Sequence, residues 1–434
     1  MDLNQIVYQI YPLGMLDAPY RNDGVTEHRI LKIISWIPHM KKLGITAVYF
    51  CPVFQSETHG YDTSDYAMID CRLGTNEDFA QVCDTLHDNG IQIILDGVFN
   101  HTGRSFYAFR DVLKNRESSR YRDWFYIDFN NHSAKDGFSY DCWEGHRSLV
   151  RLNLDHPDVR RYLFSRIDQW VAEFDIDGIR LDTAHILSRD FIHALSDHLK
   201  SRDPGFYLLG ESTAGDYRDL VSEGMLDSVT NYEHLNPMID AFNEHHLTWI
   251  TDSLNRQFGW GSVYAGMRLL SFGDNHDSNR LASRIKDPDH LKLVYDLLFA
   301  MPGLPCIYYG SEWGCTGKRT AFSDRPLRPA FAKPKWNSLC GHIAALSEAR
   351  KYYRVINDGD FVLLHASDDV LAFRRRNAQG QLTFMMNISG RKAHVSFDAG
   401  VTHGIDLIRK SAYRFDGECT LDPKSSMMIY SSWE

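Results

Sequence analysis

Eight short apolar runs alternate with helix-like segments over the first 310 residues of the chain. Runs without an apolar–polar alternation are typical of parallel strands that helices cover on both faces. Because there are eight such runs, the pattern favours an α/β fold built as a (β/α)8 TIM barrel over an open sheet. The runs occupy residues 6–11, 45–50, 91–96, 178–181, 206–210, 226–230, 269–272 and 304–309.

Two departures from this alternation predict additional domains. About 60 residues separate the third run from the next helical segment, far more than an ordinary loop needs. After roughly residue 355 the pattern changes to the period-two alternation of half-buried strands. We therefore expect a barrel whose first part spans 1–100 and whose second part spans 156–354. A small inserted domain after strand 3 would span 101–155, and an all-β C-terminal domain, a β-sandwich, would span 355–434.

Polar side chains follow four of the predicted strands. The carboxyl ends of barrel strands meet at one face, so these side chains should share one mouth, where catalytic residues are found. Taken singly, each carboxylate is equally compatible with a helix N-cap, and His101 with a structural histidine. The oxygens of Asp96 and Asn100 also suit Ca²⁺. The strand-end residues are Asp96, Asn100, His101, Arg180, Asp182, Glu211, Asn275, His276 and Asp277.

Arg180 and Asp182 form the most informative pair in this group. They are two residues apart on a strand, so both side chains point to the same side. A neighbouring cation favours the ionised form of a carboxyl group. An ionised, oriented carboxylate is what nucleophilic attack on a sugar anomeric carbon requires.

Composition limits the classes of function. A formal net charge of −10 argues against nucleic-acid binding, which needs a basic footprint. No stretch approaches 18 uninterrupted apolar residues, so we expect no membrane span. The first residues do not form a basic segment followed by an apolar run, and the eight cysteines show no metal-site spacing. We therefore expect reduced thiols and a cytoplasmic location. The oligomeric state stays open.

The strand-end motifs resemble the signature regions of the α-amylase family of glycoside hydrolases. The segments around strand 2 and strand 8 are similar to that family as well, and the match runs from about residue 5 to the C-terminus. The matching segments are Asp96-Gly-Val-Phe-Asn-His101, Gly178-Ile-Arg-Leu-Asp182, Gly210-Glu211, Phe272-Gly-Asp-Asn-His-Asp277, His59-Gly-Tyr-Asp-Thr-Ser-Asp-Tyr66 and Met301-Pro-Gly-Leu-Pro-Cys-Ile-Tyr-Tyr-Gly-Ser-Glu312.

The resemblance implies a role for each of these residues. Asp182 would be the nucleophile of a retaining mechanism, and Glu211 the general acid and then the base. Asp277 would stabilise the distorted sugar and the oxocarbenium-like transition state. Arg180 would orient Asp182. Of the remaining residues, His101 and His276 would hydrogen-bond the sugar at the cleaved bond, and Tyr61 would stack beneath it.

Two further segments bear on specificity. Leu149-Val-Arg-Leu-Asn153 resembles the marker motif of the neopullulanase and cyclomaltodextrinase group. Asp324 and Arg328 match that group's Asp-x-x-x-Arg loop, which contacts sugar towards the non-reducing side; a surface ion pair is the alternative. Ala184 replaces the lysine with which secreted α-amylases contact the acceptor sugar, so the balance of hydrolysis and transglycosylation stays open.

The expected function is that of a retaining hydrolase cleaving α-1,4 bonds of maltooligosaccharides, maltodextrins or cyclodextrins. An oligo-α-1,6-glucosidase or a glucosyl-transferring isomerase of the same family is the alternative. A catalytically inactive binding protein is the alternative from another class, and the presence of all three carboxylates argues against it. No cofactor is expected to be required. The resemblance leaves Ca²⁺ open, with Asn100 as the candidate ligand.

Overall fold

The computed structural model describes residues 5–132 and 135–433, and the eight expected barrel strands are all present in it. They form one parallel sheet in the order β12-β11-β10-β5-β2-β1-β14-β13. A parallel bridge between Thr230 and Leu270 joins its two edges and closes the barrel. The strands are β1 (Val7–Ile10), β2 (Ala47–Phe50), β5 (Gln92–Gly97), β10 (Gly178–Leu181), β11 (Tyr207–Gly210), β12 (Ser228–Val229), β13 (Leu270–Phe272) and β14 (Leu304–Tyr308).

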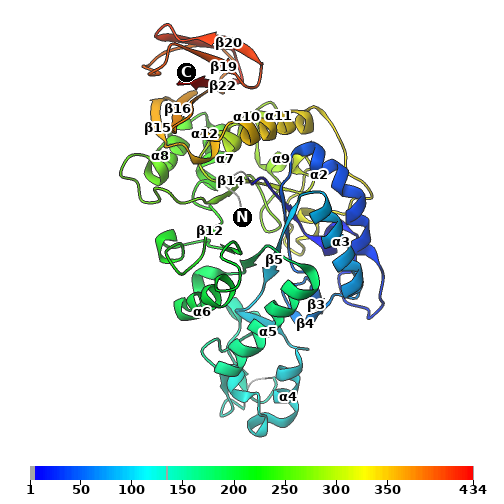
Figure 1. Ribbon diagram of the computed structural model, residues 1–434. Coiled ribbons are helices and arrows are strands. Elements are labelled where there is room, and N and C mark those ends of the chain that lie inside the picture. Colours follow the sequence, from blue (N-terminus) through cyan, green and yellow to red (C-terminus); the bar gives the residue numbers. More distant parts are fainter. Residues whose placement is uncertain (1–4, 133–134, 434) are drawn as a thin grey trace.

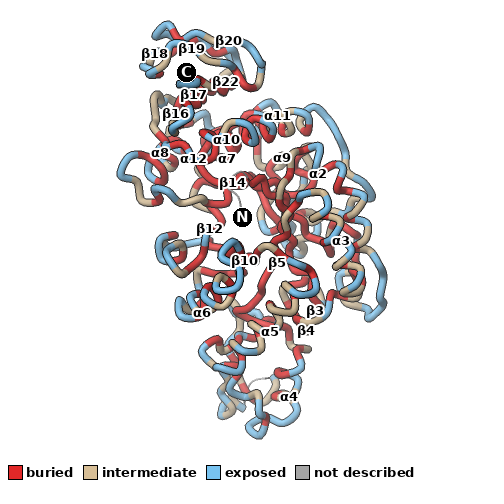
Figure 2. Tube along the Cα trace, in the orientation of Figure 1, coloured by how far each residue is buried: buried red, intermediate tan, exposed pale blue. Residues whose placement is uncertain are grey.

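Local sequence signals set the ends of the surrounding helices. Thr75 and Asp78 form a capping box that starts one helix, and Gly44, at φ +81°, ends another. Figure 2 shows the barrel strands as continuously buried, with exposure growing towards the outer helices. The helices are α1 (Pro12–Met15), α2 (Ile37–Leu43), α3 (Asn76–Asp88), α4 (Tyr107–Asn115), α5 (Pro157–Phe174), α6 (Arg189–Lys200), α7 (Leu235–Glu244), α8 (Leu247–Phe258), α9 (Leu281–Arg284), α10 (His290–Ala300), α11 (Ser338–Tyr352) and α12 (Val355–Asp358).

The long segment between β5 and α5 forms a separate lobe, at the opposite end of the molecule from the C-terminal sheet (Figure 1). Its base is the antiparallel pair β6 (His101–Gly103) and β9 (Leu149–Arg151). A second short pair, β7 (Ile127–Asp128) and β8 (Ser139–Tyr140), lies beyond it. The pairing of β6 with β9 returns the chain to the barrel directly beside His101. A further hairpin, β3 (Phe54–Ser56) and β4 (Thr63–Ile69), follows β2.

The C-terminal region is all-β. A six-stranded antiparallel sheet has the order β15-β16-β17-β22-β19-β20, and β18 pairs with β21. A second hydrophobic cluster, which includes Met385, Val395 and Leu421, packs the six-stranded sheet against the β18–β21 pair. The strands are β15 (Val362–Ala366), β16 (Val370–Arg376), β17 (Gly380–Asn387), β18 (Ala393–Ser396), β19 (His403–Asp406), β20 (Ser411–Arg414), β21 (Glu418–Leu421) and β22 (Ser425–Ser432).

Two further features concern the cysteines and the helices. All eight cysteines are free thiols. Among residues 5–132 and 135–433, none of the helices combines the length and the apolar character needed to cross a membrane.

Candidate active site

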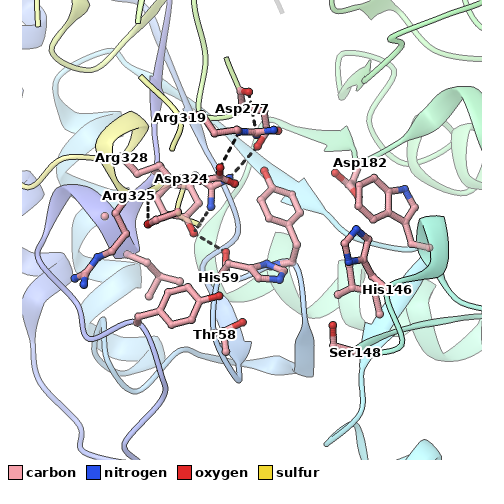
Figure 3. Close-up of a pocket in the computed structure, with 18 of the residues that line it drawn as sticks. Thr58, His59, His146, Ser148, Asp182, Asp277, Arg319, Asp324, Arg325 and Arg328 are labelled. Atoms are coloured by element: carbon pink, nitrogen blue, oxygen red, sulfur yellow. Dashed lines mark hydrogen bonds and ion pairs between the residues drawn. The ribbon is translucent and has the colours of Figure 1, made fainter. Parts of the chain in front are cut away.

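A cavity of about 1140 Å³ opens at the carboxyl ends of the barrel strands. Nine residues are predicted to be catalytic or to bind the substrate, and seven of them line this cavity. The other two, Arg180 and His276, are buried behind it and contact residues that line it. Figure 3 shows Arg319, Asp324 and Arg328 on one side of this cavity and Asp182, His146 and Ser148 on the other. The seven lining residues are Tyr61, His101, Asp182, Glu211, Asp277, Asp324 and Arg328.

Arg180 is the hub of the buried part of the site. Its Nη1 donates to Asp96 Oδ1 at 2.8 Å and to Asp182 Oδ1 at 2.9 Å. Its Nη2 lies 2.8 Å from Glu211 Oε1. The contact with Asp182 is the one expected from the alternation along the strand. The contacts with Asp96 and Glu211, on the neighbouring strands, show that one guanidinium serves three carboxylates.

Because three carboxylates share Arg180, the electrostatic environment of Asp182 differs from the simple Arg–Asp pair that the sequence predicts. Burial raises the pKa of the Asp182 carboxyl well above its usual range, and the nearby Glu211, Asp96 and Asp277 raise it further against the lowering effect of Arg180. Burial also raises the pKa of Asp96. Burial alone would lower the pKa of Arg180, but Asp96 and Glu211 raise it well above its usual range. With one guanidinium among three buried carboxyl groups, the cluster retains a proton more readily than an Arg–Asp pair would.

The Glu211 carboxyl group is held by groups from two further segments, and a third segment supports one of these groups. The backbone N–H of Thr183 donates to Oε2 at 3.0 Å, and the Tyr232 hydroxyl donates to Oε1 at 3.5 Å. Asn275 in turn donates to the Tyr232 hydroxyl at 2.6 Å. Thr183 has φ +46°, a strained value for a β-branched residue, and this conformation accompanies the hydrogen bond of its N–H to Glu211.

Asp277 is paired with two cationic groups. His276 Nε2 lies 2.9 Å from Oδ2, and Arg328 Nη2 donates to Oδ1 at 2.8 Å. Burial alone would raise the pKa of Asp277, but His276, Arg328 and Arg180 together hold it well below its usual range. Burial alone would lower the pKa of His276, but the adjacent Asp277 raises it to about 10. Asp277 is therefore ionised at neutral pH.

His276 and Tyr61 connect this pair to the other carboxylates. Gln9 Nε2 lies 2.8 Å from His276 Nδ1, and the Tyr61 hydroxyl contacts His276 Nε2. The two rings are parallel, with centroids 5.4 Å apart. The Tyr61 hydroxyl also donates to Asp96 Oδ2 at 3.1 Å. One network therefore runs from Asp277 through His276 and Tyr61 to Asp96 and Arg180.

His101 is placed differently from His276. Burial lowers its pKa to about 3, so the imidazole is neutral at neutral pH. Asn100 Nδ2 lies 3.2 Å from its Nδ1. Its Nε2 has no hydrogen-bond partner among the described residues, and the residue lines the cavity. A buried nitrogen without a partner is costly, and a ligand hydroxyl in the cavity would satisfy it.

Several residues of the site were not predicted from the sequence. Tyr232 directly follows the sixth strand, and the strand-end rule could have found it. Arg319 and Arg72 had no such signal. Arg319 Nε pairs with Asp324 Oδ1 at 2.7 Å, on the loop that carries Arg328. Arg72 is fully buried and donates to the carbonyls of Pro19, Tyr20 and Thr58, which all line the cavity.

The side chains around Asn100 decide whether a metal ion could be held there. In the described part of the chain, no group of three or more His, Cys, Asp or Glu side chains is placed to hold a metal ion. Asn100 directs its carboxamide nitrogen to His101, and Asp96 is engaged by Arg180, Tyr49 and Tyr61. This arrangement does not form the carboxylate cage that a tightly bound Ca²⁺ uses.

Comparison with known proteins agrees with this geometry. The family described as Alpha amylase, catalytic domain, matches residues 9–360. A cyclomaltodextrinase of a Bacillus species is 32% identical over 409 residues, or 88% of this chain and 72% of the relative. An intracellular maltogenic amylase of Bacillus subtilis strain 168 is 30% identical over 372 residues, or 84% of this chain and 62% of the relative. A debranching enzyme of Nostoc punctiforme superposes with a TM-score of 0.82 at 26% identity, covering 99% of this chain and 98% of that one.

Proposed function

The chain belongs to the α-amylase family of glycoside hydrolases, and from this premise we propose that it cleaves α-1,4 bonds of maltooligosaccharides, maltodextrins or cyclodextrins with retention of configuration. The observation that carries the proposal is the contact of one guanidinium, Arg180, with both Asp182 and Glu211 at the base of a cavity lined by Asp277. Two carboxyl groups held close together suit a retaining mechanism.

In the first step, Asp182 attacks the anomeric carbon while Glu211 gives its proton to the departing glycosidic oxygen. The bond to the leaving sugar breaks, and a covalent glycosyl-enzyme forms. Burial raises the pKa of Asp182, which favours a shared proton in the cluster, and the mechanism requires that proton on Glu211. Arg180 then stabilises the ionised Asp182 through its 2.9 Å contact.

In the second step, Glu211 takes a proton from a water molecule whose oxygen attacks the anomeric carbon. The bond to Asp182 breaks, and the product keeps its α configuration. An acceptor sugar in place of water gives transglycosylation. The ionised Asp277 stabilises the positive charge that develops on the sugar in both transition states. The free Nε2 of the neutral His101 is positioned to hydrogen-bond a sugar hydroxyl.

The site residues are proposed to bind the substrate without a cofactor. Ca²⁺ stays open, with Asn100 as the candidate ligand; its carboxamide nitrogen lies 3.2 Å from His101 Nδ1. The name of the relative from Bacillus subtilis, an intracellular enzyme, supports a cytoplasmic location.

The test is a timed product profile on maltoheptaose and β-cyclodextrin, measured side by side by chromatography and NMR. We expect α-anomeric products from both substrates. If the activity matches the name of the cyclomaltodextrinase relative, the ring of β-cyclodextrin should be opened faster than the linear chain is cleaved. An inert ring with cleavage of the linear chain would restrict the function to maltodextrins. Activity on isomaltose alone would contradict the α-1,4 proposal and favour the α-1,6 alternative.

A further inference from the structure

The loop that follows β14 carries a phenylalanine that the catalytic mechanism does not use. Phe322 lines the cavity, yet 98% of its surface is exposed. In the sequence it lies between Arg319 and Asp324. Figure 3 shows these two residues on the side of the cavity opposite His146 and Ser148. A large apolar side chain gains nothing from such exposure in the free protein, and exposed apolar groups at a cavity often mark a binding contact.

The segment that presents Phe322 is anchored at several points. The backbone N–H of Arg319 donates to Asn279 Oδ1 at 2.7 Å, and Arg319 Nη2 donates to the carbonyl of Asp277 at 3.2 Å. Thr320 and Ser323 close the turn around Phe322, since the backbone N–H and the hydroxyl of Thr320 both donate to the Ser323 carbonyl. The loop is therefore fixed directly to the segment that contains Asp277, and the ring is held out from a defined turn.

A second aromatic ring, that of Trp143, stacks on His146 with ring centroids 5.5 Å apart. Figure 3 shows His146 on the side of the cavity opposite Arg319 and Asp324. Trp143 lines the same cavity, is partly buried, and has its ring centroid 6.0 Å from that of His101. The next residue, Glu144, has φ +44°, so the backbone that carries Trp143 is strained at the edge of the cavity. Backbone strain of this kind concentrates at functional sites. The cavity thus has one aromatic ring on each of two opposite walls.

We propose that Phe322 is a specificity-determining residue that stacks on a glucose unit away from the cleaved bond, with Trp143 holding another part of the same chain. The apolar C–H face of a pyranose ring matches the exposed face of an aromatic ring. The ligand class is an α-glucan long enough, or curved enough, to reach both walls. This inference rests on the proposed function and deepens it, because it predicts a preference for long or cyclic substrates over short ones.

Binding to an inactive enzyme tests the proposal without depending on turnover. Maltoheptaose and maltotriose are titrated by calorimetry into E211Q and into E211Q with F322A, F322Y or W260A added. Trp260 is a matched control, because it is fully exposed and does not line the cavity. We expect F322A to weaken maltoheptaose binding about tenfold relative to maltotriose. F322Y should restore most of that loss, and W260A should change neither ligand.

Two results would overturn the inference. One is equal weakening of both ligands by F322A, which would give Phe322 no role in length selection. The other is no weakening at all, with melting temperature unchanged. The parallel turnover assay on the wild-type enzyme separates the two proposals. If no α-glucan is hydrolysed but maltoheptaose still binds E211Q more tightly than E211Q/F322A, the functional proposal fails and the role of Phe322 stands.

Discussion

Arg180 at the barrel mouth and the pair Arg350 and Arg375 beside the C-terminal sheet are all buried, but their partners differ in kind. Arg180 contacts three carboxylates. Burial alone would lower its pKa, but two of them, Asp96 and Glu211, raise it. Arg350 donates only to the carbonyls of Phe299 and Gly303, at 2.6 and 2.7 Å. Burial and the neighbouring Arg375 lower the pKa of Arg350 to about 9.

Arg375 completes the comparison. It donates to the carbonyls of Ala300, Ile356, Gly359 and Asp360, and burial lowers its pKa to about 10. These neutral partners satisfy the donors of the guanidinium but do not balance its charge. At the mouth the arginine controls the protonation of its neighbours. Arg350 and Arg375 lie where the barrel meets the C-terminal sheet, a region we call the junction. There the two arginines connect chain segments by hydrogen bonds to backbone carbonyls. The same residue type thus serves chemistry in one region and assembly in the other.

The largest effect should come from removing the nucleophile at the mouth. We expect D182N to lower kcat/KM for maltoheptaose at least about a thousandfold. The melting temperature should not fall, because burial raises the pKa of Asp182 and its ionised form costs folding free energy at neutral pH. Calorimetry and steady-state kinetics measure both. D197N, at an exposed aspartate of α6, is the control, and retention of most activity by D182N would refute the assignment.

A substitution of Arg328 tests whether this cation affects catalysis through the carboxylate that it contacts, Asp277. In R328Q, kcat/KM should fall about 10- to 100-fold, as expected for loss of a hydrogen bond to a charged group worth about 1.5–3 kcal/mol. Arg328, His276 and Arg180 hold the pKa of Asp277 down. Losing one of them raises that pKa, so the carboxylate is protonated at higher pH and the acid limb of the pH–rate profile moves upward.

R325Q is the matched control for this change. Arg325 lies on the same loop and lines the same cavity, but it makes no ion pair with Asp277. Its pH profile should be that of the wild type. An unmoved acid limb in R328Q, with a higher KM alone, would instead indicate the direct contact with sugar that the family resemblance implied for Arg328.

The junction should respond in stability and not in catalysis. R375M leaves four carbonyl groups without their donor, and we expect the free energy of unfolding to fall by about 2–4 kcal/mol. The kcat of the folded enzyme should be unchanged, since Arg375 does not line the cavity. Urea unfolding and kinetics on the same sample measure the two quantities. R414M, at an exposed arginine of β20, should change stability by less than about 0.5 kcal/mol.

The contrast also explains what the sequence could predict. Parallel strands buried on both faces are apolar throughout, so all eight barrel strands could be predicted from short apolar runs between helical segments. In the C-terminal region, period-two alternation at residues 370–376, 382–388, 393–397 and 426–430 predicted β16, β17, β18 and β22. Strands β19 and β20 are short and largely exposed, and they give no clear alternation, so they were missed.

The candidate site divides along the same line. Residues at strand ends, such as Asp182 and Glu211, could be predicted to meet because barrel geometry brings strand ends together. The sharing of Arg180 among three carboxylates depends on neighbouring strands, so the sequence suggested a simple ion pair and an ionised Asp182. Arg319 and Phe322 lie on a loop and not at the end of a strand, so the barrel geometry does not predict their position. Only their placement in space shows that they line the cavity.

The smallest effect is expected from removing divalent ions. Among the described residues, no His, Cys, Asp or Glu cluster is suited to a metal ion, and Asp96 and Glu211 are both engaged by Arg180. Dialysis against EDTA should therefore leave kcat/KM and melting temperature unchanged. Loss of activity that Ca²⁺ restores and Mg²⁺ does not would contradict this expectation. An N100A variant would then decide whether Asn100 is the ligand. If it is, N100A should bind Ca²⁺ more weakly and Ca²⁺ should no longer restore its activity. If the calcium site lies elsewhere, N100A should keep both the affinity for Ca²⁺ and the restored activity.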